Sequence, residues 1–262
     1  MTVSTRWWWV RHAPVPNAAR RIYGQDDVSA DVSDLAAIEA LAASLPTGAV
    51  WVASPLKRAL QTAAAVASGL GAHASAAPEP VIEPAIAEQH FGDWQGMSYD
   101  QLRDSLGPAY DRVWQAPGQA TPPGGESFEA VMMRVGGAIE RLTQAYRGRD
   151  IVAFGHGGSI RSALAHALGL DADAALSFRI ECLSITRIDH FDQNDKDAAS
   201  GALRPWRVSG VNMINGARSG LPDGARDRRP HPALRQGTAL WETGKSDLLA
   251  GYQGVGYEAG CG

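Results

Sequence analysis

The chain has 262 residues, of which 45% are hydrophobic and 20% are charged, and its formal net charge is -4. This length can bury the core of one large α/β domain, with or without an appendage. The slightly negative charge argues against a general nucleic-acid-binding protein, because such binding relies on Lys and Arg side chains that neutralise phosphates.

The N-terminal residues 1–14 contain no long apolar segment, and no apolar run elsewhere approaches the roughly 18 residues of a membrane span. We therefore expect a cytoplasmic protein that has neither a membrane nor a nucleic acid as its partner.

Five segments have the pattern of β-strands. Residues 6–10, 49–54 and 150–155 are apolar on both alternating faces, which is typical of parallel strands covered by helices on both sides. Residues 182–190 and 204–212 resemble a strand pair that extends the same sheet.

Helical periodicity fills the intervals between these strands. The first helix has Ser33 or Asp34 as its candidate N-cap, and the second has Pro55 at its first helical position. This order of elements predicts a three-layer α/β/α fold with a mostly parallel central sheet. The segments predicted to contain helices are residues 31–45, 54–71, 98–114, 126–148 and 158–170.

Two segments lack this periodicity. Residues 114–127 are dense in Pro and Gly and are expected to form a surface loop. From residue 216 onward the chain is rich in Gly, Arg and Pro. The sequence therefore predicts one folded domain over residues 1–215 and a C-terminal extension, residues 216–262, that is mobile or loosely docked.

Three consecutive tryptophans, residues 7–9, stand directly before Arg11 and His12. A base-stacking platform, a membrane-interface anchor and a buried strand are the three interpretations of this stretch. The overall charge and the absence of an apolar span leave the buried strand, whose tryptophans fill both helix-covered faces of the sheet. Arg11 and His12 then emerge at the carboxyl end of the strand, where ligands bind in open α/β sheets.

The other two predicted central strands also end in residues suited to binding a phosphate. Ser54 and Arg58 follow the second strand, and His156 and Gly157 follow the third and open a helix. Arg offers a planar fork of donors to a phosphoryl group, and a helix N-terminus adds backbone N–H groups. A neutral imidazole can attack phosphorus when its other nitrogen is held by a hydrogen bond.

These residues lie in five motifs whose order and content resemble the histidine phosphatase superfamily, which includes phosphoglycerate mutases and small-molecule phosphatases such as α-ribazole phosphatase. The resemblance extends from residue 6 to about residue 213, and it implies a phosphoglycerate mutase-like fold. The motifs are VRHA at residues 10–13, SPLKRALQTA at 54–63, AEQHFGDWQG at 87–96, PPGGES at 122–127 and FGHGGSIR at 154–161.

The resemblance implies a role for each matching residue. His12 corresponds to the nucleophile that becomes phosphohistidine, and His156 to the second histidine of the pocket. Arg11 and Arg58 correspond to phosphate ligands. Glu88 corresponds to the acid that protonates the leaving oxygen and then activates water, although three other carboxylates are near it in the sequence: Glu79, Glu83 and Glu126.

The sequence departs from the family pattern directly after the nucleophile. The family has Gly at the position of Ala13, and the residues that follow are APVPN instead of the usual GETxxN. Asn17 therefore lies one residue closer to the histidine than the family's asparagine. We expect activity to survive the added methyl group, with Asn17 and Gly157 as further phosphate ligands.

The resemblance implies a phosphatase that acts on a small phosphorylated metabolite. Because no cluster of carboxylates or cysteines has the spacing of metal ligands, we expect it to act without a metal or another cofactor. Residues 96–124 contain only a short helical segment and a Pro/Gly loop, which favours hydrolysis over the enclosed transfer that a mutase requires. Two alternatives stay open: a phosphoglycerate mutase-type transferase, and a non-catalytic module that binds a phosphorylated ligand. The substrate and the oligomeric state do not follow from the sequence, and loops 17–28 and 99–123 are expected to set specificity.

Overall fold

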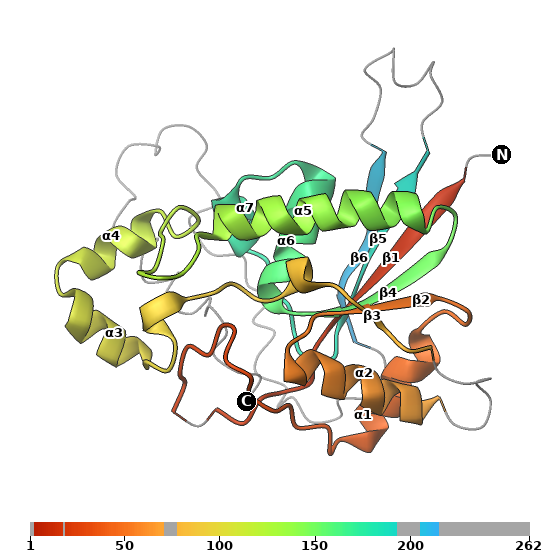
Figure 1. Cartoon of the computed structure of the whole chain (residues 1–262), viewed down its shortest axis with the longest axis horizontal. Helices are drawn as coiled ribbons and strands as arrows, with labels where there is room; N and C mark the ends of the chain where they lie inside the picture. Colours follow the sequence, from red (N-terminus) through yellow and green to blue (C-terminus); the bar gives the residue numbers. More distant parts are fainter. Residues whose placement is uncertain (1–2, 18, 71–77, 193–204, 215–262) are drawn as a thin grey trace, which may run out of the picture.

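A six-stranded sheet forms the centre of the molecule (Figure 1). The computed structural model describes residues 3–17, 19–70, 78–192 and 205–214. The strand order is β3-β2-β4-β1-β5-β6, in which the first four strands are parallel to one another and β5 is antiparallel to both of its neighbours, β1 and β6. The strands are β1 (Ser4–Arg11), β2 (Val50–Ala53), β3 (Val81–Ile82), β4 (Asp150–Gly155), β5 (Ile185–Phe191) and β6 (Trp206–Met213).

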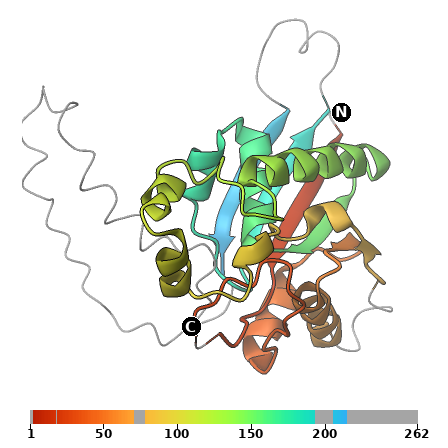
Figure 2. The ribbon, with the colours of Figure 1, turned by 60° about the vertical axis from the view of Figure 1, so that its left-hand side comes forward.

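Helices cover both faces of this sheet, so the predicted three-layer α/β/α fold is confirmed. Figure 2 shows the sheet between α5 on one side and the α1/α2 pair on the other. Two separate apolar cores correspond to the two faces: one contains residues of α5 and α6, and the other contains residues of α1 and α2. The helices are α1 (Leu35–Ser44), α2 (Lys57–Gly69), α3 (Tyr99–Leu106), α4 (Ala109–Gln115), α5 (Phe128–Ala145), α6 (Gly157–Leu168) and α7 (Ala172–Leu176).

The tryptophans of β1 fill both faces of the sheet, as predicted. Trp7 and Trp9 are fully buried on the α5/α6 face, where their rings stack with centroids 5.2 Å apart. Trp8 points to the opposite face, is partly buried, and lies under the guanidinium of Arg187 at 4.6 Å. Its Nε1 also donates to Asp150 Oδ1 at 2.9 Å. These residues are therefore core residues of the strand that leads to Arg11.

Local boundaries differ from the prediction in three places. Helix α2 begins at Lys57, so Pro55 lies before the helix and not at its first position. The segment predicted as one helical stretch over residues 98–114 is divided into α3 and α4 at Gly107, whose positive φ of 50° ends α3. The short elements β3 and α7 were not expected. Residues 216–262, predicted to form an extension, lie outside the described residues.

Helices α3 and α4 form a small layer beyond the end of the sheet, at the left of Figure 1. They enclose a third apolar cluster together with residues from the N-terminal loop and from η3 (Gly92–Trp94), a short 3-10 helix. A second 3-10 helix, η2 (Pro84–Ile86), precedes η3 in the chain and packs against α5. The stretch that joins η2 to η3 carries Glu88.

Candidate active site

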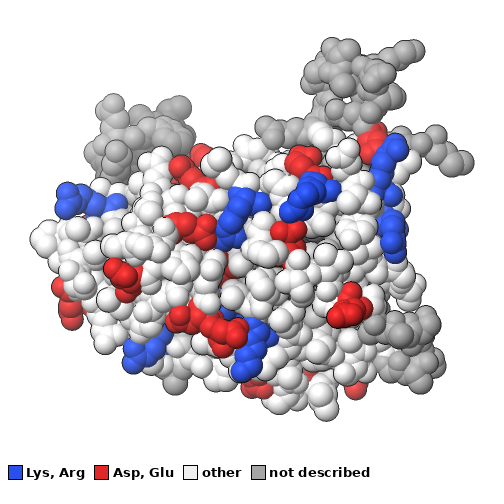
Figure 3. Space-filling model, in the orientation of Figure 1, with Lys and Arg blue, Asp and Glu red and all other residues white. Residues whose placement is uncertain are grey.

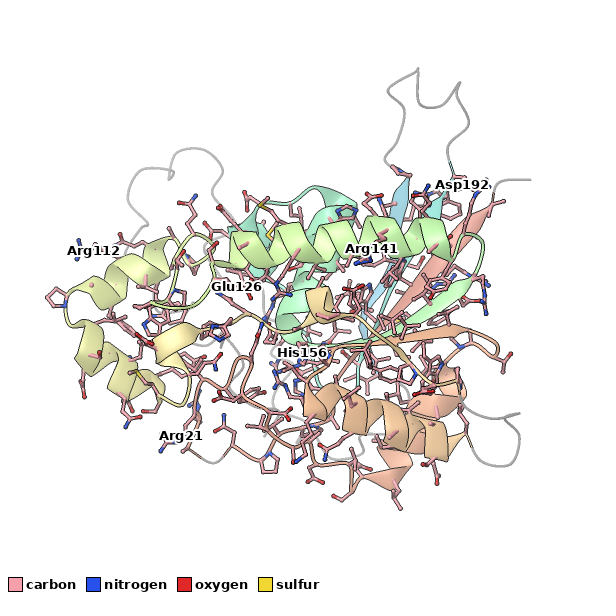
Figure 4. The ribbon with its side chains drawn as sticks, in the orientation of Figure 1. Arg21, Arg112, Glu126, Arg141, His156 and Asp192 are labelled. Carbon is pink, nitrogen blue, oxygen red and sulfur yellow. The ribbon has the colours of Figure 1, made fainter. Side chains whose placement is uncertain are left out.

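The carboxyl ends of three neighbouring parallel strands bring predicted site residues to one edge of the sheet. His12 follows β1, Ser54 follows β2 and His156 follows β4. His12 donates its main-chain N–H to Gly155 O at 3.1 Å, and Ser54 donates its own to Phe154 O at 3.0 Å. This edge, marked by His156 in Figure 4, is where ligands bind in open α/β sheets.

His12 is fully buried, and one of its ring nitrogens is held by the next residue. Its Nδ1 lies 2.7 Å from the carbonyl oxygen of Ala13. Because a carbonyl oxygen can only accept a hydrogen bond, Nδ1 carries the proton, so that in the neutral imidazole Nε2 keeps its lone pair. The ring therefore has the tautomer that a nucleophilic imidazole needs.

Ala13, where the family has glycine, is accommodated without backbone strain. It is fully buried and does not have a positive φ. Its N–H donates to Thr62 Oγ1 at 2.8 Å, and Thr62 Oγ1 donates to Arg58 O at 2.7 Å. The turn that carries His12 is thus tied to helix α2.

His156 lies beside His12 and is also fully buried. The ring centroids of the two histidines are 5.3 Å apart, and the planes of their rings meet at 55°. The Nε2 of His156 is 2.7 Å from Ser54 Oγ. His156 is the N-cap of α6, so the N-terminus of this helix adds a favourable potential for an anion at the same edge.

Two arginines approach this edge from different elements. Arg58, fully buried on α2, donates to Gly24 O at 2.6 Å and to Asp26 O at 3.0 Å, and its guanidinium lies 4.8 Å from the centre of the Tyr23 ring. Within the described part of the chain its Nε has no hydrogen-bond acceptor. A bound anion would satisfy this buried donor.

Arg11, the last residue of β1, is also buried. Its Nη1 donates to the carbonyl oxygen of Ile180 at 2.5 Å. The main chain of Arg11 pairs on one side with β4, and its carbonyl oxygen accepts a bond from Leu183 N at 3.1 Å. The side chain is therefore fixed between β1 and the loop that precedes β5.

Glu88 is the buried carboxylate that joins this group from the η2–η3 segment. It is 2% exposed, and each of its oxygens accepts a backbone N–H: Oε1 from Gln89 at 2.8 Å and Oε2 from Gly158 at 3.1 Å. Gly158 belongs to the first turn of α6, which His156 opens. The Glu88 carboxylate is thus attached to the same helix N-terminus as the second histidine.

The other three carboxylates are separated from this arrangement. Glu79 is exposed, Glu83 forms an ion pair with Arg141, and Glu126 forms one with Arg134. Glu88 is the one of the four that contacts α6 at its N-terminus. The geometry therefore supports the choice of Glu88 among the carboxylates of this region.

Asn17 and Gly157 are placed differently from each other. Both polar groups of the Asn17 amide bind the main chain of Arg21, with Nδ2 donating to Arg21 O at 2.8 Å and Oδ1 accepting from Arg21 N at 2.9 Å. The structure thus uses Asn17 to close its own loop, and a contact with phosphate stays a prediction. Gly157 is buried as the first residue of α6, and its role as a phosphate ligand also stays a prediction.

Several residues that shape the site were not identified from the sequence. The most prominent are Arg134 on α5 and Gln95 after η3. Gln95 Oε1 accepts from Gln25 N at 3.0 Å, while its Nε2 donates to Asp26 Oδ1 at 2.7 Å, which fixes the loop whose carbonyls bind Arg58. Single polar residues in an amphipathic helix or a loop give no periodic signal that would identify them.

A small, largely apolar cavity lies between the N-terminal loop and the α3/α4 layer. Its lining combines one residue of the predicted specificity loop 17–28 with residues of the second loop, 99–123, and it includes Gln89, the neighbour of Glu88. The cavity is lined by Ile22, Gln89, Phe91, Trp94, Tyr99, Leu102, Val113, Trp114, Pro117 and Ala120.

Charge is distributed evenly over the face of the molecule that Figure 3 shows, with acidic and basic side chains interspersed. Among the residues that the structure describes, no three or more His, Cys, Asp or Glu side chains are grouped closely enough to hold a metal ion. Over the same residues, no helix combines the length and hydrophobicity needed to cross a bilayer.

The sequence matches the family model of the histidine phosphatase superfamily (branch 1) over residues 7–198. It is 36% identical over 171 residues to a glucosyl-3-phosphoglycerate phosphatase of Mycolicibacterium vanbaalenii, a match that covers 60% of this chain and 71% of the relative. A metal-independent phosphoserine phosphatase of Arabidopsis thaliana is 30% identical over 161 residues, covering 58% of this chain and 64% of the relative.

A bifunctional protein of Mycobacterium tuberculosis is 33% identical over 132 residues, and the match covers 50% of this chain but only 34% of that relative. Solved structures agree with the fold. An α-ribazole phosphatase from Shigella flexneri superimposes with a TM-score of 0.63 at 22% identity, over 82% of this chain and all of that one. A mycobacterial glucosyl-3-phosphoglycerate phosphatase gives a TM-score of 0.65 at 23% identity, over 80% of this chain and 99% of that one.

Proposed function

Because this chain belongs to the histidine phosphatase superfamily, we propose that it is a metal-independent phosphatase that hydrolyses a small phosphomonoester through a phosphohistidine at His12. The observation that carries this proposal is the hydrogen bond from His12 Nδ1 to Ala13 O. It leaves the Nε2 lone pair for attack on phosphorus, beside a second buried histidine and two buried arginines.

The reaction follows in two steps from these positions. In the first, His12 Nε2 forms a bond to phosphorus while the bond from phosphorus to the ester oxygen breaks, and Glu88 gives its proton to that oxygen so that an alcohol leaves. In the second, the Glu88 carboxylate takes a proton from water, the water oxygen bonds to phosphorus, and the P–N bond breaks to regenerate neutral His12. Arg11, Arg58 and His156 hold the peripheral phosphoryl oxygens in both steps.

Hydrolysis is favoured over mutase-type transfer by the small size of the layer above the site. This layer consists of two short helices, α3 and α4, and a loop. A mutase has to keep water from the phosphohistidine and to retain a bisphosphate intermediate, which requires a more extensive enclosure. A binding module without turnover has no need of a buried acid, so the retention of Glu88 favours an enzyme.

The substrate is a small phosphorylated metabolite with an alcohol leaving group. Both named phosphatase relatives act, by their names, on monoesters of this kind, glucosyl-3-phosphoglycerate and phosphoserine. A panel that contains phosphoserine, phosphoglycerates, sugar phosphates and α-ribazole phosphate covers this class.

The test is release of inorganic phosphate from that panel in the presence of a chelator. The parent protein should be active, and His12→Ala should be inactive. His166→Ala is the matched control, because it removes an imidazole that pairs with Glu140 on the α5/α6 side of the fold. Its activity should equal that of the parent. The proposal would be refuted if the parent protein released no phosphate from any substrate of the panel, or released it only after a metal was added.

We also propose that residues 1–215 hold the complete catalytic domain and that residues 216–262 are a C-terminal extension. The family match ends at residue 198, which supports this division. A chain that stops at Gly216 should stay soluble and release phosphate as the full chain does. Loss of solubility or of activity would place part of the extension in the catalytic domain.

A further inference from the structure

The guanidinium of Arg134 on α5 donates hydrogen bonds to the backbone of the segment that carries Glu88. We propose that Arg134, held in place by Glu126, is the positioning residue that fixes Glu88 as the general acid; this inference rests on the proposed function. Among the described residues, Arg134 binds the backbone of this segment and the Glu126 carboxylate, and it has no hydrogen bond to a catalytic side chain. Its effect on the reaction is therefore exerted through the position of Glu88.

The contacts of Arg134 converge on three carbonyl oxygens within residues 85–88, from η2 to Glu88. Its Nη1 donates to Ala85 O at 2.7 Å and to Ala87 O at 2.8 Å, and its Nη2 donates to Glu88 O at 3.0 Å. Three carbonyl oxygens bound by one rigid fork fix the path of the chain immediately before and at the acid. A lysine has no comparable planar set of donors, so it cannot make the same three contacts.

Glu126 fixes the fork from the other side. Its carboxylate accepts from Arg134 Nε at 3.0 Å and from Nη2 at 2.8 Å, which is the bidentate geometry of a strong charge-assisted pair. Figure 4 labels Glu126 at the N-terminal end of α5.

Glu126 also binds the residues that follow the acid. Its Oε1 accepts from His90 N at 3.0 Å, and its carbonyl oxygen accepts from Gln89 Nε2 at 2.8 Å. The Arg134–Glu126 pair therefore holds the backbone on both sides of Glu88, while Gly158 and Gln89 hold the carboxylate itself. A displacement of about 1 Å at a reacting group can cost about 100-fold in rate. The Arg134–Glu126 pair, hereafter the clamp, prevents such a displacement of the Glu88 carboxyl group.

The expected signature of a misplaced acid is a loss that depends on the leaving group. An alkyl phosphate expels a strongly basic alkoxide, so its hydrolysis needs the proton from Glu88. An activated aryl phosphate such as 4-nitrophenyl phosphate expels a weakly basic phenoxide and needs that proton much less. A defect in phosphate binding or in folding would slow both substrates alike.

The test measures kcat/KM of Arg134→Lys on both kinds of substrate, because kcat/KM reports only the steps up to departure of the leaving group and is independent of the hydrolysis of the phosphohistidine, in which Glu88 acts for both substrates alike. We expect kcat/KM for an alkyl phosphate to fall by about 10- to 100-fold, which is part of the 10²–10⁴ that general acid catalysis supplies. With 4-nitrophenyl phosphate, kcat/KM should stay within about threefold of the parent. Binding of inorganic phosphate, measured by calorimetry, should keep the parent affinity, because Arg134 does not line the phosphate pocket.

Two further variants make the result specific. Glu88→Gln removes the acid itself, and its kcat/KM should show the same dependence on the leaving group, to a larger extent. Arg141→Lys is the matched control: Arg141 lies two turns further along α5 and pairs with Glu83 at 2.9 Å, just before η2, so it contacts the same segment away from Glu88. It should behave as the parent on both substrates.

The inference is overturned if Arg134→Lys lowers kcat/KM equally for both substrates, if it weakens phosphate binding, or if Arg141→Lys reproduces its pattern. If Arg134→Lys does not fold, the same criteria apply to Glu126→Gln, which keeps the shape of Glu126 and removes its charge. When Glu88→Gln shows the leaving-group dependence and neither clamp variant does, the clamp fails alone. When Glu88→Gln shows no such dependence, the assignment of the acid in the proposed function fails, and the clamp fails with it.

Discussion

The backbone of Gly158 lies directly against the carboxylate of Glu88. Gly158 N donates to Glu88 Oε2 at 3.1 Å, and a Cβ at Gly158 would lie only 2.0 Å from Oε1. The carboxylate therefore occupies the volume that a side chain would fill, and glycine is required at this position in α6 for the acid to reach the helix N-terminus.

Replacing Gly158 with alanine should consequently impair catalysis without unfolding the protein. The methyl group would displace the Glu88 carboxylate, and we expect kcat for an alkyl phosphate to fall by about 10²-fold or more, as for loss of a general acid. Alanine favours a helix over glycine by about 1 kcal/mol, so the melting temperature should be maintained. Kinetics and thermal unfolding of the same preparation check both statements.

Gly137 provides the control for this variant. It lies in helix α5, and apart from its chain neighbours and the nearby backbone of that helix, no atom is within 4 Å of the position that its Cβ would take. Gly137→Ala should therefore keep full activity. A fully active Gly158→Ala would show that the acid tolerates a shift, and it would remove the structural reason for assigning this role to Glu88.

Arg58 should determine the affinity for the phosphoryl group. Its guanidinium is fixed by Gly24 O and Asp26 O, and lysine cannot reproduce this planar arrangement. We expect Arg58→Lys to weaken binding of inorganic phosphate by about 10- to 100-fold, because a hydrogen bond to a charged group contributes about 1.5–3 kcal/mol. Calorimetric titration measures this change directly.

The exposed neighbour Lys57 is the matched control for Arg58. Lys57→Ala should bind phosphate as the parent does. Equal losses from both variants would mean that general positive charge, and not the Arg58 fork, attracts the anion.

The methyl group of Ala13 should have little effect on the reaction. Ala13 has no positive φ, and its N–H and carbonyl oxygen already bind Thr62 and His12. We expect Ala13→Gly to keep kcat/KM within about threefold and to lower stability by about 0.4–1 kcal/mol through the greater freedom of the unfolded chain. A gain in activity of tenfold or more would indicate that the methyl group hinders the nucleophile.

Acid should weaken the clamp around Glu88 through Glu126. Burial raises the pKa of the Glu126 carboxyl, but hydrogen bonds from Arg134 and from His90 N, with the nearby positive charge, outweigh it and hold the pKa below its usual value. The unfolded chain therefore binds a proton more readily than the folded one. The stability that this pair contributes is complete above about pH 4.3, the ordinary value for Glu, and is lost as the pH falls through the lower folded value.

The corresponding measurement is the melting temperature of the parent and of Glu126→Gln as a function of pH. The parent should be the more stable of the two at neutral pH, and the difference should shrink as the pH drops below about 4. A difference that is constant over the whole range would show that the charge of Glu126 does not contribute.

The parts of the site that could be predicted from the sequence are those that follow strands. His156 comes directly after a continuous apolar run and His12 follows one with only Arg11 between, and parallel strands necessarily end at the same edge. Glu88 has no such position, and it was identified through the resemblance of its motif to the family. The structure then accounts for this choice by the contact with Gly158.

Other features depend on tertiary contacts that have no periodic pattern. The edge strand β3 is only two residues long and both are exposed, so it lacks an apolar signal. Helix α2 begins at Lys57, where Asp27 Oδ1 accepts the Lys57 N–H at 2.7 Å, a partner supplied by a distant loop. In the sequence, Arg134 has the pattern of an ordinary polar residue of an amphipathic helix. Its role depends on three carbonyl acceptors from a distant segment, which only the folded structure reveals.

The central claim is that the phosphoryl group is transferred to His12, and trapping this intermediate tests it most directly. The protein is mixed with a fast substrate such as 4-nitrophenyl phosphate and quenched in alkali, because protonation in acid would cleave the P–N bond. Peptide mass spectrometry then locates the label. We predict one phosphoryl group on His12 in the parent, more of it in Glu88→Gln, where activation of water is impaired, and none in His12→Ala. Phosphate release by the parent with no label on His12, or with undiminished turnover in His12→Ala, would contradict the mechanism.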